Sequence, residues 1–163
     1  MTASIAFYTI GVYGKSSEEF FNSLLSNNID SFIDIRRRRA VRGSLYSFVN
    51  SKKLQSKLTE LGIHYFHILE LAPTNEIRAI QNEVDKNAGV LKRDRAKLGQ
   101  KFTEEYIRLI LGSYDFSDLN FKLENVKAKK VVLFCVEREA EACHRSLVAD
   151  KLKQLYSVTI NHL

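Results

Sequence analysis

The chain has 163 residues, of which 45% are hydrophobic and 27% are charged. This composition is usual for a soluble globular protein, and the length fits one domain with a sizeable core, so we expect a single domain over residues 1–163. No apolar run is long enough to cross a membrane, and the N-terminal apolar stretch is not preceded by the basic residues with which a signal peptide begins. Two cysteines fit a reducing compartment. We therefore expect a cytoplasmic protein without a membrane partner, and the net charge of +6 favours an anionic one.

Segments rich in β-branched and aromatic residues predict strands, and apolar residues that recur at helical spacing predict helices. Ser16 and Glu19 form a capping-box pattern that predicts a helix of about three turns. Residues 87–101 are polar and basic, and we expect a mobile excursion there. In chain order, the predicted elements are a strand at 4–11, the helix after Ser16, a strand at 31–36, a helix at 51–61, a strand at 63–69, helices at 75–86, 103–111 and 117–127, a strand at 130–136, a helix at 144–155 and a strand at 158–160.

This alternation of strands and helices predicts an α/β fold with three layers, in which a mostly parallel sheet carries helices on both faces. In such a sheet the loops that follow the strands converge on one edge, where ligands usually bind. We therefore expect the functional site at the carboxyl ends of the strands. The converging loops are 11–16, 36–50, 70–74 and 137–143.

The triplet Gly14-Lys15-Ser16 lies between the first strand and the first helix, where a phosphate-binding loop would lie. The full motif needs a glycine five residues before the Gly-Lys-Ser triplet, and that position is Thr9. The sequence therefore allows only a degenerate phosphate loop. Lys15 remains a candidate contact for an anion.

The loop after the second strand is rich in arginine, whose planar guanidinium matches phosphate and carboxylate groups. We expect Arg36 to bind the ligand and the following arginines to contact nucleic acid, since such a cluster forms an electrostatic footprint for phosphates. The alternative is a solvated, self-repelling loop. The arginines after Arg36 are Arg37, Arg38, Arg39 and Arg42.

Carboxylates lie at the ends of three predicted strands. Asp34 shares a strand face with Arg36, so it could act as a general base, hold a metal or orient the arginine, and we expect it to pair with the arginine. Glu70 and Glu137 follow the next two strands and face the same edge. Asp34 and Glu137 are the candidate acid or base, and Glu70 is a candidate ligand contact.

The segment Cys143-His144-Arg145-Ser146 opens the helix that follows the fourth strand. The first turn of a helix offers free N–H groups and a positive dipole end, which together suit an anion, most often phosphate. We expect Arg145 and Ser146 to bind this anion and His144 to donate to it or move a proton, while the alternative is that Arg145 only tethers the helix inside the fold. Cys143 is either a nucleophile or a helix-cap residue.

Two cysteine-based chemistries find little support. A cysteine phosphatase or sulfurtransferase needs arginine at the sixth position after its cysteine, and those positions hold Glu141 and Ala149. Zinc could be bound by Cys135, Cys143 and His144, but a fourth ligand is missing from the neighbourhood and no Cys-x-x-Cys pair occurs. We therefore expect no metal, and the cofactor is left open.

Several stretches match known motifs in order along the chain. They are Thr9-Ile10-Gly11, Asp34-Ile35-Arg36, Gly62-Ile63-x-Tyr65-x-His67-x-x-Glu70-Leu71, and Cys135-x-Glu137 with Cys143-His144-Arg145-Ser146-x-x-Ala149. In these the chain resembles a microbial family catalogued as domain of unknown function 488. The chain departs from that family at Val12-Tyr13 and Ala72-Pro73. The resemblance implies a cytosolic α/β domain, supplies no reaction, and makes the Gly-Lys-Ser triplet an incidental variant of a family position.

Three functions stay open at this point. The first is binding of a phosphate-bearing ligand, a nucleotide or a nucleic acid, at the carboxyl edge of the sheet, with hydrolase or transferase activity as an option because carboxylates lie beside arginines. The second is a non-enzymatic nucleic-acid-binding module that uses the Arg36–Arg42 loop and basic residues of 92–101. The third is a degenerate phosphate-loop nucleotide hydrolase or kinase. The oligomeric state is not predicted.

Overall fold

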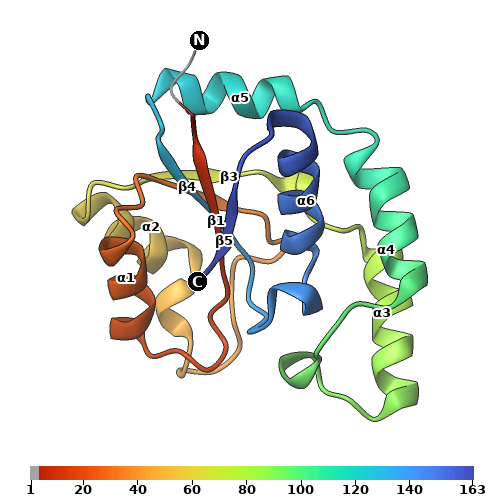
Figure 1. Ribbon diagram of the computed structural model, residues 1–163. Helices are drawn as coiled ribbons and strands as arrows, with labels where there is room; N and C mark the ends of the chain where they lie inside the picture. Colours follow the sequence, from red (N-terminus) through yellow and green to blue (C-terminus); the bar gives the residue numbers. More distant parts are fainter. Residues whose placement is uncertain (1–3) are drawn as a thin grey trace.

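The central sheet has five parallel strands in the order β3-β2-β4-β1-β5 (Figure 1). The computed structural model describes residues 4–163. All five predicted strands are present, each within about two residues of its expected position. The strands are β1 (Ala6–Ile10), β2 (Ser31–Asp34), β3 (His64–His67), β4 (Lys130–Phe134) and β5 (Ile160–His162).

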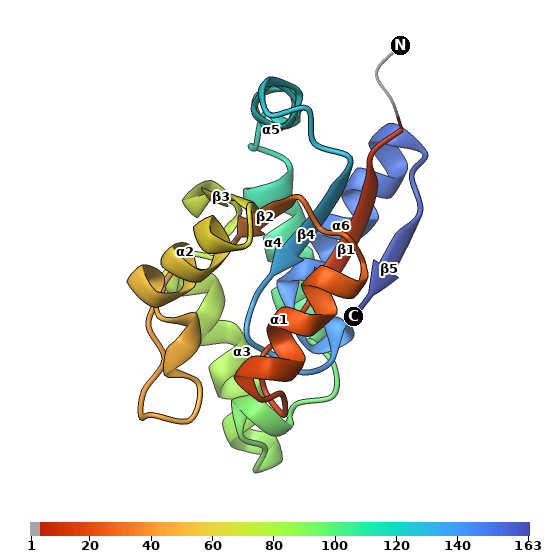
Figure 2. The same ribbon diagram turned by 90° about the vertical axis from the view of Figure 1, so that its left-hand side faces the viewer.

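Helices cover both faces of this sheet, so the predicted three-layer α/β fold is confirmed. Helices α1 and α2 lie on one face, and α6 and α4 lie on the other, with α3 packed against α4 (Figures 1 and 2). No helix within residues 4–163 is long and apolar enough to cross a bilayer. The helices are α1 (Ser17–Ser26), α2 (Ser51–Glu60), α3 (Asn75–Ala88), α4 (Gln100–Tyr106), which continues as a π-helix over Ile107–Leu111, α5 (Phe116–Asn125) and α6 (His144–Tyr156).

The middle of the sheet is fully enclosed. Every residue of β2 is buried, and so are residues 131–134 of β4, as expected for a parallel sheet with both faces covered. The pairing of Asp34 with both Phe134 and His67, and of Ile10 with Phe134, aligns the carboxyl ends of four strands. A ligand can therefore reach the middle of the sheet only at the ends of its strands.

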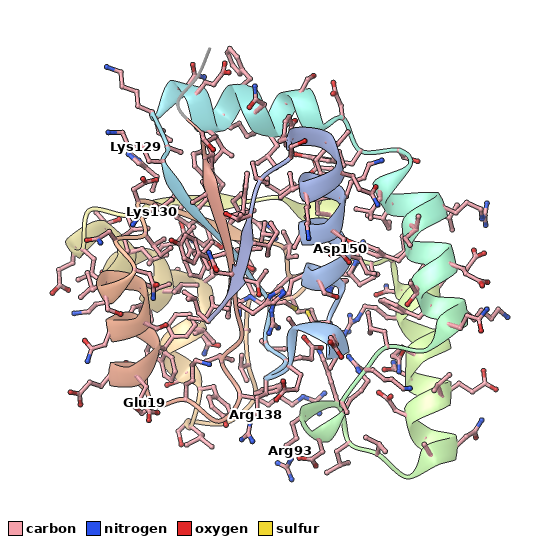
Figure 3. All side chains as sticks on the ribbon, viewed as in Figure 1. Glu19, Arg93, Lys129, Lys130, Arg138 and Asp150 are labelled. Carbon is pink, nitrogen blue, oxygen red and sulfur yellow. The ribbon has the colours of Figure 1, made fainter. Side chains whose placement is uncertain are left out.

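The carboxyl edge is the lower side of the sheet in Figure 1, where the loops after β1, β2 and β4 meet. Arg93 and Arg138 project at this end of the molecule, whereas Lys129 and Lys130 lie at the opposite end (Figure 3). The segment predicted as a mobile excursion contains a short 3-10 turn at Lys92–Asp94 and also lies at the carboxyl edge. Its mobility stays a prediction.

The serine of the Gly-Lys-Ser triplet is a helix cap. The Ser16 hydroxyl oxygen accepts a hydrogen bond from the Glu19 N–H at 3.1 Å, and the Ser16 N–H donates to a Glu19 carboxylate oxygen at 2.7 Å. The predicted capping box is thus confirmed. Because this hydroxyl is engaged in starting α1, the triplet works as a helix N-terminus in this fold.

Replacing the cap should destabilise the protein. Ser16→Ala removes the acceptor for one N–H of the first turn of α1, and we expect the free energy of unfolding to fall by about 1 kcal/mol. Urea unfolding followed by circular dichroism measures the change. Ser17→Ala is the matched control, because Ser17 is exposed and its side chain makes no hydrogen bond among the described residues. Equal stability of the two variants would contradict the capping role.

Candidate functional site

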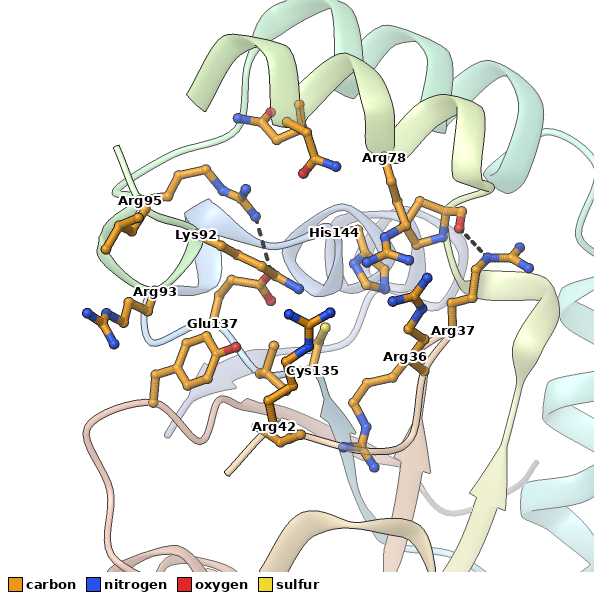
Figure 4. Close-up of a pocket in the computed structure, with 18 of the residues that line it drawn as sticks. Arg36, Arg37, Arg42, Arg78, Lys92, Arg93, Arg95, Cys135, Glu137 and His144 are labelled. Carbon is orange, nitrogen blue, oxygen red and sulfur yellow. Dashed lines mark hydrogen bonds and ion pairs between the residues drawn. The ribbon is translucent and has the colours of Figure 1, made fainter. Parts of the chain in front are cut away.

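A pocket of about 660 Å³ lies at the carboxyl edge of the sheet, between the loops after β1, β2 and β4, helix α3 and the Lys92–Asp94 turn (Figure 4). Its lining is strongly basic, since eight arginine and lysine side chains face it and Glu137 is the one acidic lining residue within residues 4–163. A cationic pocket therefore lies at the carboxyl edge, where the sequence predicted the functional site. The basic residues are Arg36, Arg37, Arg38, Arg42, Arg78, Lys92, Arg93 and Arg95.

A buried ion pair forms one wall of the pocket. The guanidinium of Arg36 binds Asp34 through both side-chain oxygens, with Nε at 2.9 Å and Nη2 at 2.8 Å, and Nη2 also donates to the Val49 carbonyl. Asp34 is fully buried and accepts a further hydrogen bond from the Tyr65 hydroxyl at 2.7 Å. Asp34 thus orients Arg36, in the arrangement that its position on the strand predicted.

Arg36 keeps one donor free. Its guanidinium carbon lies 4.7 Å from the centroid of the Phe134 ring, and the side chain is 3% exposed. Nη1 is buried and has no hydrogen-bond partner among the described residues, while Arg36 lines the pocket. A buried donor without a partner is costly, so an acceptor inside the pocket would be bound favourably at Nη1.

Glu137 lies opposite, held by two cations. One carboxylate oxygen, Oε1, lies 3.1 Å from Nη2 of Arg95 and 3.3 Å from Nζ of Lys92, while Oε2 is buried without a partner among residues 4–163. Burial by itself would raise the pKa of Glu137, but the nearby positive charges, Lys92 first, outweigh burial and lower it to about 2. Glu137 is therefore ionised near neutral pH and can accept a hydrogen bond from a ligand, but it cannot serve as a general acid.

Arg95 ties the segment after α3 to the body of the protein. Its Nη1 binds Asp85 at 2.7 Å, and its Nε and Nη2 both donate to the Ala142 carbonyl. With its contact to Glu137, the side chain is almost fully enclosed, at 8% exposed. In the alternative of a nucleic-acid-binding module, Arg95 is one of the basic residues of 92–101; in the fold it connects α3 to the segment before α6.

Two thiols and one imidazole meet at the inner wall of the pocket. The Nε2–H of His144 donates to the Ile35 carbonyl at 2.9 Å, since a carbonyl can only accept, and Nδ1 is the ring nitrogen next to the sulfur of Cys143. Nδ1 lies 3.7 Å from Sγ of Cys143. The ligand atoms of Cys135, Cys143 and His144 all lie within 4.8 Å of one another. Cys135 and His144 line the pocket, and Cys143 lies just behind them, 1% exposed.

The two sulfur atoms have different environments. A hydrogen bond with Cys143, together with burial, raises the pKa of the Cys135 thiol well above its ordinary value. Sγ of Cys143 instead accepts the Arg145 N–H at 3.5 Å as the cap of α6. Cys135 is therefore a protonated thiol near neutral pH, and Cys143 fills the helix-cap role that was one of its two predicted alternatives.

Arg145 lies behind the pocket wall and does not line the pocket. It is 1% exposed, and its Nη1 and Nη2 donate to the backbone carbonyls of Glu137 at 2.6 Å and Arg138 at 3.0 Å. Gly11 allows this close approach, because a Cβ at that position would lie 1.9 Å from the Glu137 carbonyl oxygen. The contacts of Arg145 are those of the tethering alternative, with Nη1 and Nη2 used inside the fold, while its buried Nε has no partner among the described residues.

The other predicted anion contacts also lie outside the pocket lining. Ser146 donates its hydroxyl to the Cys143 carbonyl at 2.8 Å. Lys15 is half-buried, and burial followed by the charges of Arg145 and Arg138 lowers its pKa. Glu70 is exposed on a 3-10 turn at Leu69–Leu71. The pocket is thus formed around Arg36 and the arginine loop, and within the first turn of α6 only His144 lines it.

Within the arginine loop, Arg37 donates to the Pro73 carbonyl at 2.7 Å, and Arg39 lies 3.5 Å from the Tyr65 hydroxyl. Arg38 and Arg42 are exposed and line the pocket. Sequence reasoning missed the contribution of α3, which presents Arg78, Gln81 and Asn82 to the pocket. Their spacing of three and four residues places them on one face of the helix. The sequence shows this shared face but does not show which part of the protein the face covers.

Arg145 should stabilise the fold. Arg145→Lys keeps the charge but loses the fork that satisfies two buried carbonyls, so we expect the free energy of unfolding to fall by about 1–3 kcal/mol. Thermal or urea unfolding checks this. Arg138→Lys is the matched control, because that side chain is exposed. If Arg145→Lys were as stable as the control, the tethering role would be wrong.

Glu137 should make the free energy of unfolding depend on pH in the acid range. Because its pKa falls from 4.5 to about 2 on folding, its contribution is present above about pH 4.5 and is lost as the pH falls toward 2. The shift corresponds to about 3 kcal/mol. We expect the stability gap between the parent and Glu137→Gln to narrow by that amount over this range in urea unfolding series. Exposed Glu139 supplies the control Glu139→Gln, whose gap to the parent should stay constant.

Comparison with known proteins places the chain in a family without identifying a reaction. No curated protein and no solved structure matched it. A family model described as "Domain of unknown function DUF488" matches residues 16–152. This match spans β2, β3 and β4 and every residue of the pocket lining except Tyr13. The chain therefore belongs to the DUF488 family.

Proposed function

We propose that the protein binds a small phosphate-bearing molecule, with a nucleotide as the class that fits best, in the cationic pocket at the carboxyl edge of the sheet. The observation that carries the proposal is the lining itself, in which eight basic side chains surround one carboxylate. Arg36 lines the pocket and has in Nη1 a buried donor without a partner among the described residues.

The excess of charge in the pocket is not neutralised by the protein. Arg38, Arg42 and Arg78 line the pocket and have no ion-pair partner within the described residues. Like charges gathered around one cavity repel one another, and a bound anion would remove that repulsion. Phosphate matches the guanidinium fork in two-pronged, charge-assisted hydrogen bonds.

Other lining groups favour a nucleotide over inorganic phosphate. Tyr13 and Tyr46 have ring centroids 5.3 Å apart and both line the pocket, as does Phe102. A base can stack on such rings, and the ionised carboxylate of Glu137, which lines the pocket, can accept a hydrogen bond from a sugar hydroxyl or an exocyclic amine. The volume of about 660 Å³ lies within the range usual for pockets that enclose small organic ligands.

Nucleic acid is a second candidate because the basic surface continues outside the pocket. Arg38, Arg39 and Arg42 surround a shallower depression beside it. A single-stranded end could place one nucleotide in the pocket and its backbone along this loop. The phosphate-loop alternative has less support, since Ser16 caps α1 and Lys15 is not part of the pocket lining.

Equilibrium binding of a matched ligand series tests the proposal. The series is a nucleoside, its mono- and triphosphate, pyrophosphate and a short single-stranded oligonucleotide, each at two salt concentrations. We expect the nucleotides to bind and the nucleoside not to bind. Arg78→Gln should weaken nucleotide binding by about tenfold or more, because one charge-assisted contact is lost. Arg108→Gln, an exposed change on the π-helical segment outside the pocket, should bind like the parent.

The outcomes separate the candidates. Nucleoside binding as tight as nucleotide binding, or no binding of any phosphate compound at low salt, would overturn the proposal. Oligonucleotide binding that falls steeply with salt, in the absence of mononucleotide binding, would favour the nucleic-acid candidate.

A further inference from the structure

We propose that Cys135, Cys143 and His144 bind a zinc-class divalent cation at the inner wall of the pocket, with one coordination position open toward the cavity. The site is independent of the proposed phosphate ligand, since the metal alone can test it. The sequence alone offers the same three residues without a fourth neighbouring ligand, and for that reason predicts no metal. The fold brings those three together and directs them to a pocket.

The spacing of the ligand atoms matches tetrahedral zinc coordination. With Zn–S near 2.3 Å and Zn–N near 2.1 Å, a thiolate sulfur and an imidazole nitrogen lie about 3.6 Å apart. The observed separation between Sγ of Cys143 and Nδ1 of His144 is 3.7 Å. Sγ of Cys135 lies within 4.8 Å of both atoms. A side-chain adjustment of about 1 Å or less therefore completes the ligand set.

The imidazole is already oriented as a ligand. Metal-binding histidines usually donate their second ring N–H to a carboxylate or a backbone carbonyl, which fixes the ring and the tautomer. In this protein the Ile35 carbonyl accepts the Nε2–H of His144, so Nδ1 presents its lone pair to the two sulfur atoms. The Arg145 N–H donates to Sγ of Cys143, which holds that sulfur atom in position. Both contacts hold the ligands in place before a metal arrives.

The charges around the cluster balance. The basic pocket by itself opposes a divalent cation, but two thiolates would bring two negative charges, which offset the charge of the cation. The nearby cations Lys92 and Arg95 are already paired with the Glu137 carboxylate. Binding must release the thiol protons, so affinity should rise with pH as the thiols become easier to ionise.

The number of ligands indicates the class of site. Structural zinc sites use four protein ligands, whereas sites with three protein ligands keep a water or substrate in the fourth position. Within residues 4–163 no fourth ligating side chain belongs to the cluster. Cys135 and His144 line the pocket, so the fourth position faces the cavity. A water bound there would be acidified by the metal and could act on a ligand in the same cavity.

Cobalt titration of the reduced, metal-free protein tests the site. We expect one Co²⁺ per chain, with the intense ligand-field bands of tetrahedral cobalt and a thiolate-to-cobalt charge-transfer band, and we expect Zn²⁺ to abolish both. Cys135→Ser and Cys143→Ser should each reduce the charge-transfer band and weaken binding by about a hundredfold or more, since loss of a second-shell partner alone reaches that size. His64→Gln is the control, because His64 is an exposed histidine of β3.

Three results would contradict the proposed metal site. Absence of the charge-transfer band in the parent, or unchanged cobalt affinity in both serine variants, would overturn the proposal. Circular dichroism shows whether the variants are folded. If a serine variant is unfolded, alkylation of the parent decides the question: one equivalent of Zn²⁺ should protect both thiols, and a chelator should restore their reactivity. Thiols that react equally with and without Zn²⁺ would overturn the proposal.

Discussion

The buried ion pair of Asp34 and Arg36 is the interaction on which the pocket depends. Two charges removed from water are tolerated only when nearly all of their hydrogen-bonding capacity is used. Asp34 meets this condition with contacts from Arg36 and Tyr65, and Arg36 adds the Val49 carbonyl and the Phe134 ring. The pair thereby connects β2, β3, β4 and the loop that leads to α2. What remains unsatisfied is Nη1 of Arg36, so the side chain that completes the buried ion pair also lines the pocket.

A second set of contacts fixes the opposite wall. Arg145 binds the carbonyls of Glu137 and Arg138, and His144 binds the carbonyl of Ile35. The first turn of α6 is therefore attached to the loop after β4 and to the end of β2. The Nη groups of Arg145 are therefore used inside the fold, whereas Arg78 and arginines of the loop after β2 line the pocket.

The two proposals describe neighbouring parts of one cavity. Basic side chains from three segments would hold the charged part of a ligand, and the thiol–imidazole cluster would place a metal-bound water beside it. Glu137 lies between them, ionised and with one free oxygen. A carboxylate with so low a pKa cannot donate a proton, so chemistry in this cavity needs another acid or an activated water. The metal would supply that water, and the arginines would stabilise the developing charge.

The sequence by itself determined several features that depend on residues close to one another in the chain. Strand and helix periodicity gave the α/β order, the Ser16–Glu19 pattern gave the start of α1, and alternation along a strand gave the Asp34–Arg36 pair. These are local because each involves neighbours within one turn or one strand. Only the tertiary structure decided which loop residues face the cavity. His144 meets Ile35 across 109 positions and Arg95 meets Glu137 across 42, and packing of α3 and α6 turns Arg78 toward the pocket and Arg145 away from it. No local pattern encodes such choices, because burial and charge pairing between distant segments set them.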